Sequence, residues 1–198
     1  VGNPEFTNKK LILLRTNSSG QTIWENHFYL NEARAIAACP SADGGFLVLA
    51  ENYWDTIEYR NVVLKLDGAG MLQWTRIIPN GVIANGLSDI IAVSDGNFMA
   101  VGTSRDASFN TRNWLVKIAP DGNILWQKVF GATGKIVKRL TELPTGGIVV
   151  SGHLSDFYLD KVSLNGDLIW EKNYPEPGNQ TNYDLLVTAD GNISLLGT

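Results

Sequence analysis

The 198-residue sequence predicts an all-β fold built from four copies of one four-stranded repeat. The first observation is a tryptophan that recurs roughly every 50 residues. A glycine stands four residues before each of these tryptophans, and a basic residue stands five residues before each glycine. The three columns hold Trp24, Trp74, Trp126 and Trp170; Gly20, Gly70, Gly122 and Gly166; and Arg15, Lys65, Lys117 and Lys161.

A second block with the same period predicts where the strands lie. An Asp-Gly or Thr-Gly pair opens a short apolar run that ends in a small residue, and these blocks begin at Asp43, Asp95, Thr145 and Asp190. Each copy is therefore expected to form four strands, which in the second copy span about residues 88–94, 98–103, 114–119 and 124–130. We expect the Asp-Gly and Asn-Gly pairs to form two-residue hairpins, because Gly, Asn and Asp tolerate positive φ. No segment sustains a helical apolar period; residues 137–143 come closest and are too short.

Four-stranded repeats of this length predict a β-propeller of antiparallel blades. One twisted sheet cannot bury both of its faces alone, so blades pack face to face, and we expect the four repeated tryptophans to lie between them. Residues 1–10 are expected to be a tail or an expression remnant, and residues 11–198 a single propeller domain. Its repeats are expected at about residues 11–61, 62–113, 114–157 and 158–198.

The strand count leaves three ways of completing the ring. Complete blades are expected at residues 34–78, 87–130 and 137–173. If the strand before the Asp-Gly turn is innermost, residues 182–198 supply two inner strands and residues 11–28 the two missing outer strands. The fourth blade could close within one chain, or two chains could form an eight-bladed ring as a homodimer. The third alternative is that the chain is a piece of a longer protein.

Composition excludes several classes of function. Hydrophobic residues make up 44% of the chain and charged residues 18%, as in a folded globular protein. The net charge of −4 and the pI of about 5.1 give no basic surface for nucleic acid. No apolar run is long enough to cross a bilayer. The single cysteine, Cys39, excludes an intrachain disulfide and is expected in a buried strand. With only two histidines we expect no metal site, and we expect no cofactor.

Residues 113–131 resemble a propeller repeat of secreted and lipid-anchored bacterial proteins, related to kelch and pyrroloquinoline-quinone-type repeats. The matching pattern is a Trp-Leu-Val-Lys segment followed by a Gly and a Trp, together with the Asp-Gly-Gly block, and it extends over nearly the whole chain. The resemblance implies a propeller fold and an extracellular, periplasmic or cell-surface location, and says little about function. Ala50 replaces the small glycine in the first copy and Thr145 replaces Asp in the third, which argues against a ligand bound identically by every blade.

Candidate binding residues are expected in the long connections between the second and third strands, because variable loops on a rigid scaffold carry function. Two of these connections are residues 51–60 and 103–112. Their aromatic and basic side chains could stack a sugar ring or anchor a protein partner, although packing and solvated charges are the alternatives. His153 occupies the column of Thr103 and Thr198. The candidate set is Tyr53, Trp54, Tyr59, Arg60, Arg105, Arg112 and His153.

The sequence carries no recognisable catalytic motif. It therefore predicts a non-catalytic binding or protein-interaction module with a glycan or protein ligand. The alternatives are a propeller enzyme, either quinone-dependent or glycan-active, and a purely structural segment of a longer surface protein.

Overall fold

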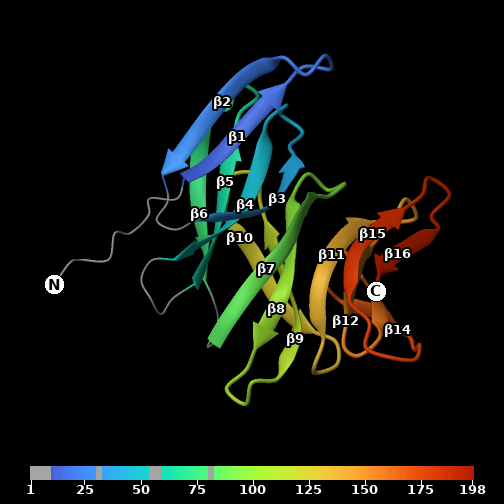
Figure 1. The fold of residues 1–198 in the computed structure, drawn as a ribbon. Helices are drawn as coiled ribbons and strands as arrows, with labels where there is room; N and C mark the ends of the chain where they lie inside the picture. The colour runs from blue at the N-terminus through green and yellow to red at the C-terminus, as the bar shows by residue number, and fades with distance from the viewer. Residues whose placement is uncertain (1–9, 30–32, 54–58, 80–82) are drawn as a thin grey trace. The chain divides into compact units, whose positions relative to one another are not determined.

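The computed structural model describes residues 10–29, 33–53, 59–79 and 83–198, and all regular structure in these ranges is β-strand (Figure 1). The all-β class is thereby confirmed. The described strands are β1 (Lys10–Thr16), β2 (Thr22–Tyr29), β3 (Arg34–Pro40), β4 (Phe46–Tyr53), β5 (Tyr59–Leu66), β6 (Leu72–Ile78), β7 (Ile83–Ala92), β8 (Phe98–Arg105), β9 (Thr111–Ile118), β10 (Ile124–Phe130), β11 (Ile136–Glu142), β12 (Ile148–His153), β13 (Phe157–Val162), β14 (Leu168–Tyr174), β15 (Asn182–Val187) and β16 (Ile193–Gly197).

The strands form antiparallel sheets in chain order within two compact units, Val1–Pro79 and Asn80–Thr198. The first unit contains the β1–β2 hairpin and the four-stranded sheet β3-β4-β5-β6. The second contains the sheets β7-β8-β9-β10 and β11-β12-β13-β14 and the β15–β16 hairpin. Three complete four-stranded repeats and two half repeats therefore occur among the described residues, as the sequence predicts.

Small irregularities in register identify which half of a repeat each terminal hairpin represents. In the complete sheets, the pairing of the first and second strands shifts near the start of the first strand, for example between Val137 and Arg139. The pairing of the third and fourth strands shifts near the turn, for example between Lys161 and Val162. The β15–β16 hairpin has the first kind of shift and the β1–β2 hairpin the second. The β1–β2 hairpin thus corresponds to the third and fourth strands of a repeat, here called its outer half, and the β15–β16 hairpin corresponds to the first and second strands, in the order the sequence predicts.

The prediction of two-residue hairpins is wrong. In the turn between β3 and β4, the Ser41 N–H donates to the Gly45 carbonyl and the Gly44 N–H donates to the Ser41 carbonyl, which leaves three residues in the loop. The loop is a turn followed by a glycine in the left-handed region, with φ 81° at Gly44. Eight turns of this form carry glycine at that position, with φ between 78° and 85°: Gly20, Gly44, Gly70, Gly96, Gly122, Gly146, Gly166 and Gly191.

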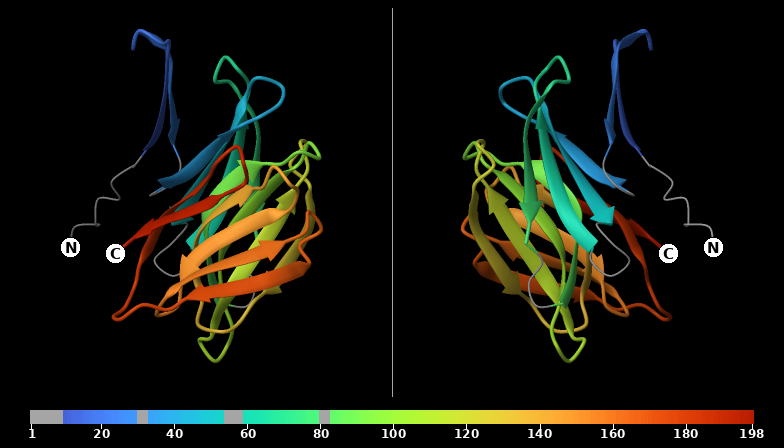
Figure 2. Two further views of the ribbon diagram at one scale, coloured as in Figure 1. Left: turned by 90° about the vertical axis from the view of Figure 1, so that its right-hand side faces the viewer. Right: turned by 90° about the vertical axis from the view of Figure 1, so that its left-hand side faces the viewer.

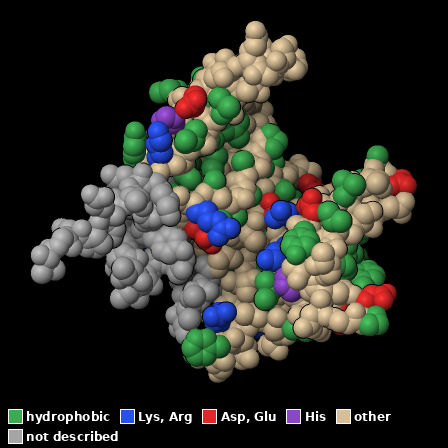
Figure 3. All heavy atoms as spheres, viewed as in Figure 1, with side chains coloured by type: hydrophobic (Ala, Val, Ile, Leu, Met, Phe, Trp, Pro, Cys, Tyr) green, Lys and Arg blue, Asp and Glu red, His purple; other side chains and the backbone are tan. Residues whose placement is uncertain are grey.

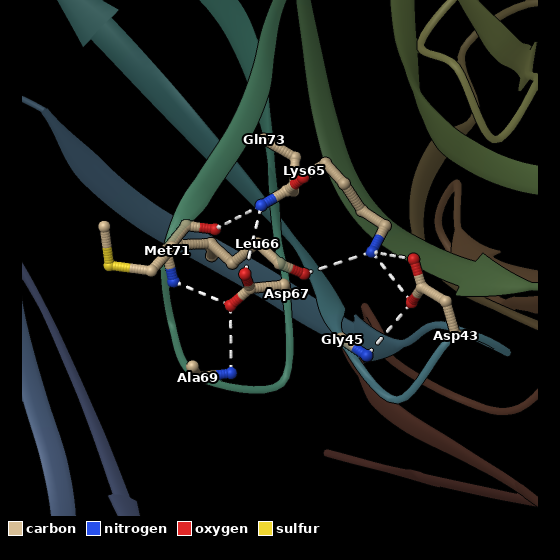
Figure 4. A network of polar contacts seen from close by, with 8 residues as sticks. All are labelled: Asp43, Gly45, Lys65, Leu66, Asp67, Ala69, Met71 and Gln73. Carbon is tan, nitrogen blue, oxygen red and sulfur yellow. Dashed lines mark hydrogen bonds and ion pairs between the residues drawn. The ribbon is translucent and has the colours of Figure 1, made fainter.

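Two of the four residues in the basic column hold these turns in place. Lys65 Nζ lies 2.9 and 2.7 Å from the two carboxylate oxygens of Asp43 and donates to the Leu66 carbonyl at 3.1 Å (Figure 4). The hydrogen bond from Lys65 lowers the pKa of Asp43 to about 2. Lys117 makes the same ion pair with Asp95 in the next sheet. In the third sheet Thr145 stands at the Asp position, so this pair with Lys161 cannot form.

The core of the second unit lies between facing sheets. Met99, Val101 and Leu115 of the β7–β10 sheet pack against Ile148 and Val150 of the β11–β14 sheet, and all of these side chains are buried. The β15–β16 hairpin lies beside the β11–β14 sheet and packs against β11 and β12 (Figures 1 and 2). In the first unit, a separate cluster joins β1 and β2 to the β3–β6 sheet. Face-to-face burial is what makes these thin sheets stable.

Two of the four repeated tryptophans are confirmed to lie between sheets. The ring centre of Trp24 on β2 lies 5.6 Å from that of Phe46, with the two rings tilted, and Trp24 Nε1 donates to the Gly68 carbonyl in the β5–β6 turn at 3.3 Å. A methyl group added to Gly166, in the β13–β14 turn, would lie 2.7 Å from the ring of Trp126 on β10. The turn of one sheet therefore covers the tryptophan of the preceding sheet. Cys39 is buried in β3, as predicted.

Candidate functional site

The connection between β8 and β9 is shorter than the sequence suggested. β8 extends to Arg105 and β9 begins at Thr111, because the ladder continues through the pairs Ser104–Arg112 and Arg105–Thr111. What remains is a three-residue turn of the same form as the glycine turns, in which the Phe109 N–H donates to the Asp106 carbonyl. The expectation of a long variable loop here is therefore wrong.

Phe109 occupies the turn position that glycine holds in the eight other turns. Its φ is 64°, and it is the one non-glycine residue with positive φ in the described part of the chain. The Asp106 carboxylate fixes the turn, since it accepts hydrogen bonds from the Ser108 N–H at 2.9 Å and the Asn110 N–H at 3.0 Å. A bulky residue in this region is strained, and such strain clusters at functional positions.

The Phe109 side chain points into solvent rather than into a core. It is 70% exposed, the second-highest exposure among the large hydrophobic side chains of the described residues. The guanidinium carbon of Arg105 lies 6.0 Å from the centre of the Phe109 ring, at the outer limit of a cation–π contact. The turn therefore presents an aromatic ring and a cation together on a backbone that Asp106 holds rigid.

The structure separates the two arginines that the sequence grouped. Adjacent pairs of a ladder point to opposite faces, so Arg105 and Arg112, which belong to neighbouring pairs, do not share a face. Arg112 Nε donates to the Gly131 carbonyl at 3.1 Å and so holds the connection between β10 and β11. Arg105 remains a candidate for binding, whereas the contact of Arg112 is structural.

His153, at the end of β12, accepts a hydrogen bond at 3.4 Å from the Asn182 N–H on its Nδ1 atom. Burial lowers the pKa of His153, and the charge of Lys138 acts in the same direction. The imidazole is therefore neutral near pH 7 and takes part in joining β12 to β15.

The remaining candidates surround the connection between β4 and β5. Tyr53 and Tyr59 are the last and first residues of their strands and pair with each other, and Arg60 pairs with Asn52. These three residues thus belong to strands, whereas the sequence had placed them in a loop. Trp54 lies outside the described residues, so its predicted role as a binding residue stays a prediction.

A buried polar network in the second unit was not predicted. Lys135 Nζ lies 2.7 and 2.8 Å from the Asp160 carboxylate oxygens and 2.6 Å from Glu171 Oε1. Asn113 Nδ2 donates to Asp160 at 2.7 Å, and the Tyr158 hydroxyl donates to Asn113 Oδ1 at 2.7 Å. The side chains of Lys135, Asn113, Asp160 and Tyr158 are all essentially inaccessible to solvent. The network joins β9, β13 and the β10–β11 connection, and its burial leaves no room for a substrate.

The carboxylates of Asp160 and Glu171 share the cation of Lys135, and their pKa values are shifted in opposite directions. Burial raises the pKa of Asp160 to about 6, although Lys135 opposes the rise. The hydrogen bond from Lys135 lowers the pKa of Glu171. Burial also raises the pKa of the Tyr158 hydroxyl, so this group stays a donor at neutral pH.

The raised pKa of Asp160 predicts a distinct pH dependence of stability. An unfolded Asp loses its proton near pH 3.9, whereas folded Asp160 keeps its proton until about pH 6. Between these values the unfolded state binds fewer protons, so the contribution of Asp160 to the free energy of unfolding falls as pH rises from about 4 to 6. Urea unfolding at several pH values, with Asp160→Asn as the reference, measures this contribution. The assignment would be contradicted if the free energy of unfolding of the wild type, relative to that of Asp160→Asn, rose with pH in this window.

Among residues 10–29, 33–53, 59–79 and 83–198, no group of three or more His, Cys, Asp or Glu side chains is placed to hold a metal ion. The described part of the chain also contains no helix that could span a membrane.

Comparison with solved structures shows the fold. No family model matches the sequence, and no curated protein matches it. A Dyadobacter fermentans protein of unknown function matches with a TM-score of 0.66 at 12% identity, over 98% of this chain and 66% of that one. The WD40 β-propeller domain of Doa1 matches with a TM-score of 0.62 at 16% identity, over 91% and 52% of the respective chains. A Bacteroides caccae protein of unknown function matches with a TM-score of 0.58 at 11% identity, over 93% and 64%.

The four-stranded antiparallel sheets are thus propeller blades, and the predicted fold class is confirmed. The chain spans between 52% and 66% of the length of these three structures. At such low identity the likeness concerns the fold alone.

Proposed function

We propose that this chain is a non-catalytic interaction module that binds a protein partner through the turn between β8 and β9, with Phe109 as the anchor. One observation carries the proposal: Phe109 stands at a turn position that glycine occupies in the eight other turns. A left-handed backbone costs a non-glycine residue about 1–2 kcal/mol. A side chain that is strained and exposed contributes nothing evident to folding, so we attribute the presence of Phe109 at this position to binding.

The chemistry of the turn suits a protein ligand. Aromatic and arginine side chains dominate the energetic centres of protein interfaces. Phe109 offers an apolar ring and Arg105 a cation beside it. The hydrogen bonds to Asp106 fix the turn before binding, which lowers the entropy lost in the complex. The expected partner presents an apolar pocket with a carboxylate at its rim.

Selection of a phage-displayed random dodecapeptide library on the immobilised protein tests the proposal. We expect enriched peptides to combine apolar and acidic residues. Their affinity should fall roughly 30-fold in Phe109→Ala, the size of a typical interface hot spot. Met71→Ala is the matched control, because Met71 is also an exposed apolar side chain and directly follows a three-residue turn, and it should bind like wild type.

Phe109→Gly separates binding from folding. Glycine relieves the strain at φ 64° but adds chain entropy, so the variant should be about 0.5–1 kcal/mol more stable than wild type while it binds no better than Phe109→Ala. Urea unfolding measures the first quantity and peptide titration the second. Unchanged peptide affinity in both Phe109 variants would refute the proposed anchor.

The relation to kelch and pyrroloquinoline-quinone-type repeats, and a periplasmic or cell-surface location, remain predictions from the sequence resemblance. A glycan ligand on the β4–β5 connection is likewise a prediction, and a glycan array probed with wild type and Tyr59→Ala tests it.

A further inference from the structure

An open groove of about 990 Å³ lies beside the β15–β16 hairpin in the second unit. Its walls come from β13, β14 and the β15–β16 hairpin, and they are mainly apolar. Phe157, Leu159 and Trp170 form one wall, and Ile193 and Leu195 the other. The β15–β16 hairpin packs on β11 and β12, which leaves the groove over the outer half of the β11–β14 sheet.

The contact between the β7–β10 and β11–β14 sheets shows what fills the corresponding position over the third and fourth strands of a complete sheet. There, the β13–β14 turn covers the outer half of the β7–β10 sheet: Gly166 lies against Trp126, and Asp167 pairs with Lys128 at 2.7 Å. Lys117 Nζ donates to the Leu164 carbonyl in the same turn at 2.8 Å. The filling element is thus a hairpin of third and fourth strands.

The groove contains residues that correspond to those of the β7–β10 sheet in that contact. By the repeat, Trp170, Lys172 and Lys161 correspond to Trp126, Lys128 and Lys117, and Trp170 and Lys172 line the groove. The groove therefore has the ring and one of the two cations of the complete interface.

Exposed apolar side chains on β15 and β16 indicate that this half repeat is incomplete. Leu186 is 63% and Leu196 65% exposed, and hydrophobic side chains gather over this hairpin at the right of Figure 3. The residues that correspond to Leu196 in the complete sheets, Leu49, Val101 and Ser151, are fully buried.

The β1–β2 hairpin has several features of the turn that fills the complete interface, although Gln21 stands at the position of Asp167, so the ion pair to the lysine is absent there. Its register shift is that of a third and fourth strand, and Gly20 in its turn corresponds to Gly166. Ile12 and Leu14 are 56% and 55% exposed, although the residues in their columns of the β13 strand, Tyr158 and Asp160, are fully buried. Ile12 and Leu14 are therefore exposed on β1, on a face of the hairpin that also carries His27 and Glu25 from β2.

We propose that the groove binds the β1–β2 hairpin of a second copy of this chain, and that β1 of that copy pairs antiparallel with β16. The register of β12 with β13 places Arg15 opposite Ser194 and Leu14 opposite Leu195. Each copy has three complete sheets, and two reciprocal exchanges complete two more, so the closed dimer is an eight-bladed ring.

The length of the similar propellers favours a second copy over closure within one chain. This chain spans only 52–66% of their length, so the propellers that it resembles contain more strands than one copy of it does. In the dimer, the β3–β6 sheet, which packs on β1 and β2 within the first unit, would accompany the hairpin and cover Leu186 and Leu196.

A cysteine pair tests the register and the source of the hairpin together. Opposite residues of antiparallel strands have Cα atoms about 4.5–5.5 Å apart, within the range that a disulfide bridges. Arg15 and Ser194 are both exposed, and the double variant removes only an exposed hydrogen bond from Arg15 to the Gly68 carbonyl, so Arg15→Cys/Ser194→Cys should still fold. Under mild oxidation we expect a covalent species at twice the monomer mass on a non-reducing gel.

The matched control is Leu14→Cys/Ser194→Cys, which moves one cysteine by a single residue to the opposite face. It should cross-link at least tenfold less than the Arg15/Ser194 pair. A cross-link at monomer mass would overturn the proposal in favour of closure within one chain. Equal cross-linking of both pairs, or none in either, would show that β1 does not pair with β16 in this register.

Discussion

We expect Lys135→Met to lower the free energy of unfolding by about 3–5 kcal/mol, the usual cost of removing one partner from a buried ion pair. Asp160 is fully buried, and Lys135 supplies two of its hydrogen bonds. Without the cation, the carboxylate must be ionised without a partner or take up a proton. Since protonation relieves the penalty, the loss of stability should be smaller at pH 5 than at pH 8.

The double variant Lys135→Met/Asp160→Val controls for this prediction. The column of Asp160 holds Leu64 and Val116 in the other complete sheets, so valine fits the repeat at this position. We expect the double variant to recover part of the stability lost in Lys135→Met, because no charge is left buried. Urea unfolding followed by tryptophan fluorescence measures both. A loss below about 1 kcal/mol in the single variant would mean that the network does not hold the two sheets together.

The second large effect is expected for Gly166→Ala, which tests how neighbouring blades fit. Gly166 has φ 79°, and an added Cβ would lie 2.7 Å from the Trp126 ring and 3.1 Å from the Lys128 side chain. The left-handed backbone costs alanine about 1–2 kcal/mol, and overpacking adds about 1–3 kcal/mol. Thermal or urea unfolding should therefore show a total loss of about 2–5 kcal/mol.

Gly146→Ala isolates the packing part of that loss. Gly146 has nearly the same φ, 84°, in the same kind of turn, but nothing lies within 4 Å of an added Cβ. It should lose only the backbone part, about 1–2 kcal/mol. Equal losses in the two variants would show that the turn does not press on Trp126, and would remove the basis for comparing the groove with the complete interface.

The sequence was sufficient to predict the fold because each copy of the repeat meets the same packing and turn requirements with the same residue types. Trp24 and Trp126 lie between sheets because each sheet must bury both faces. The glycine four residues before each tryptophan is a residue of the turn that leads into the strand of that tryptophan, and Gly70 and Gly166 lie against the tryptophan of the preceding sheet. The strand ends were less predictable. Polar residues such as Arg105 and Arg112 look like a loop, but their backbone pairing extends the ladder.

The candidate site and the buried network consist of residues that depart from the repeat, and the sequence indicated their roles only weakly. Phe109 fills a glycine position in a turn that was expected to be part of a long loop, so its strain could not be recognised without the backbone. Asp160 could have been found, since a carboxylate stands in a column of Leu64 and Val116. Its partner Lys135 lies in a connection outside every column, and only the folded chain brings the two together.

The exchange of hairpins between copies is the central claim about how this propeller is completed, and the solution mass tests it most directly. Light scattering on a size-exclusion column, over a range of protein concentrations, should give a species of twice the 21.7 kDa chain mass. Trp170→Ala, which alters the groove without touching β1, should shift the equilibrium toward the single chain. A wild-type protein that stays at 21.7 kDa at every concentration would contradict the claim.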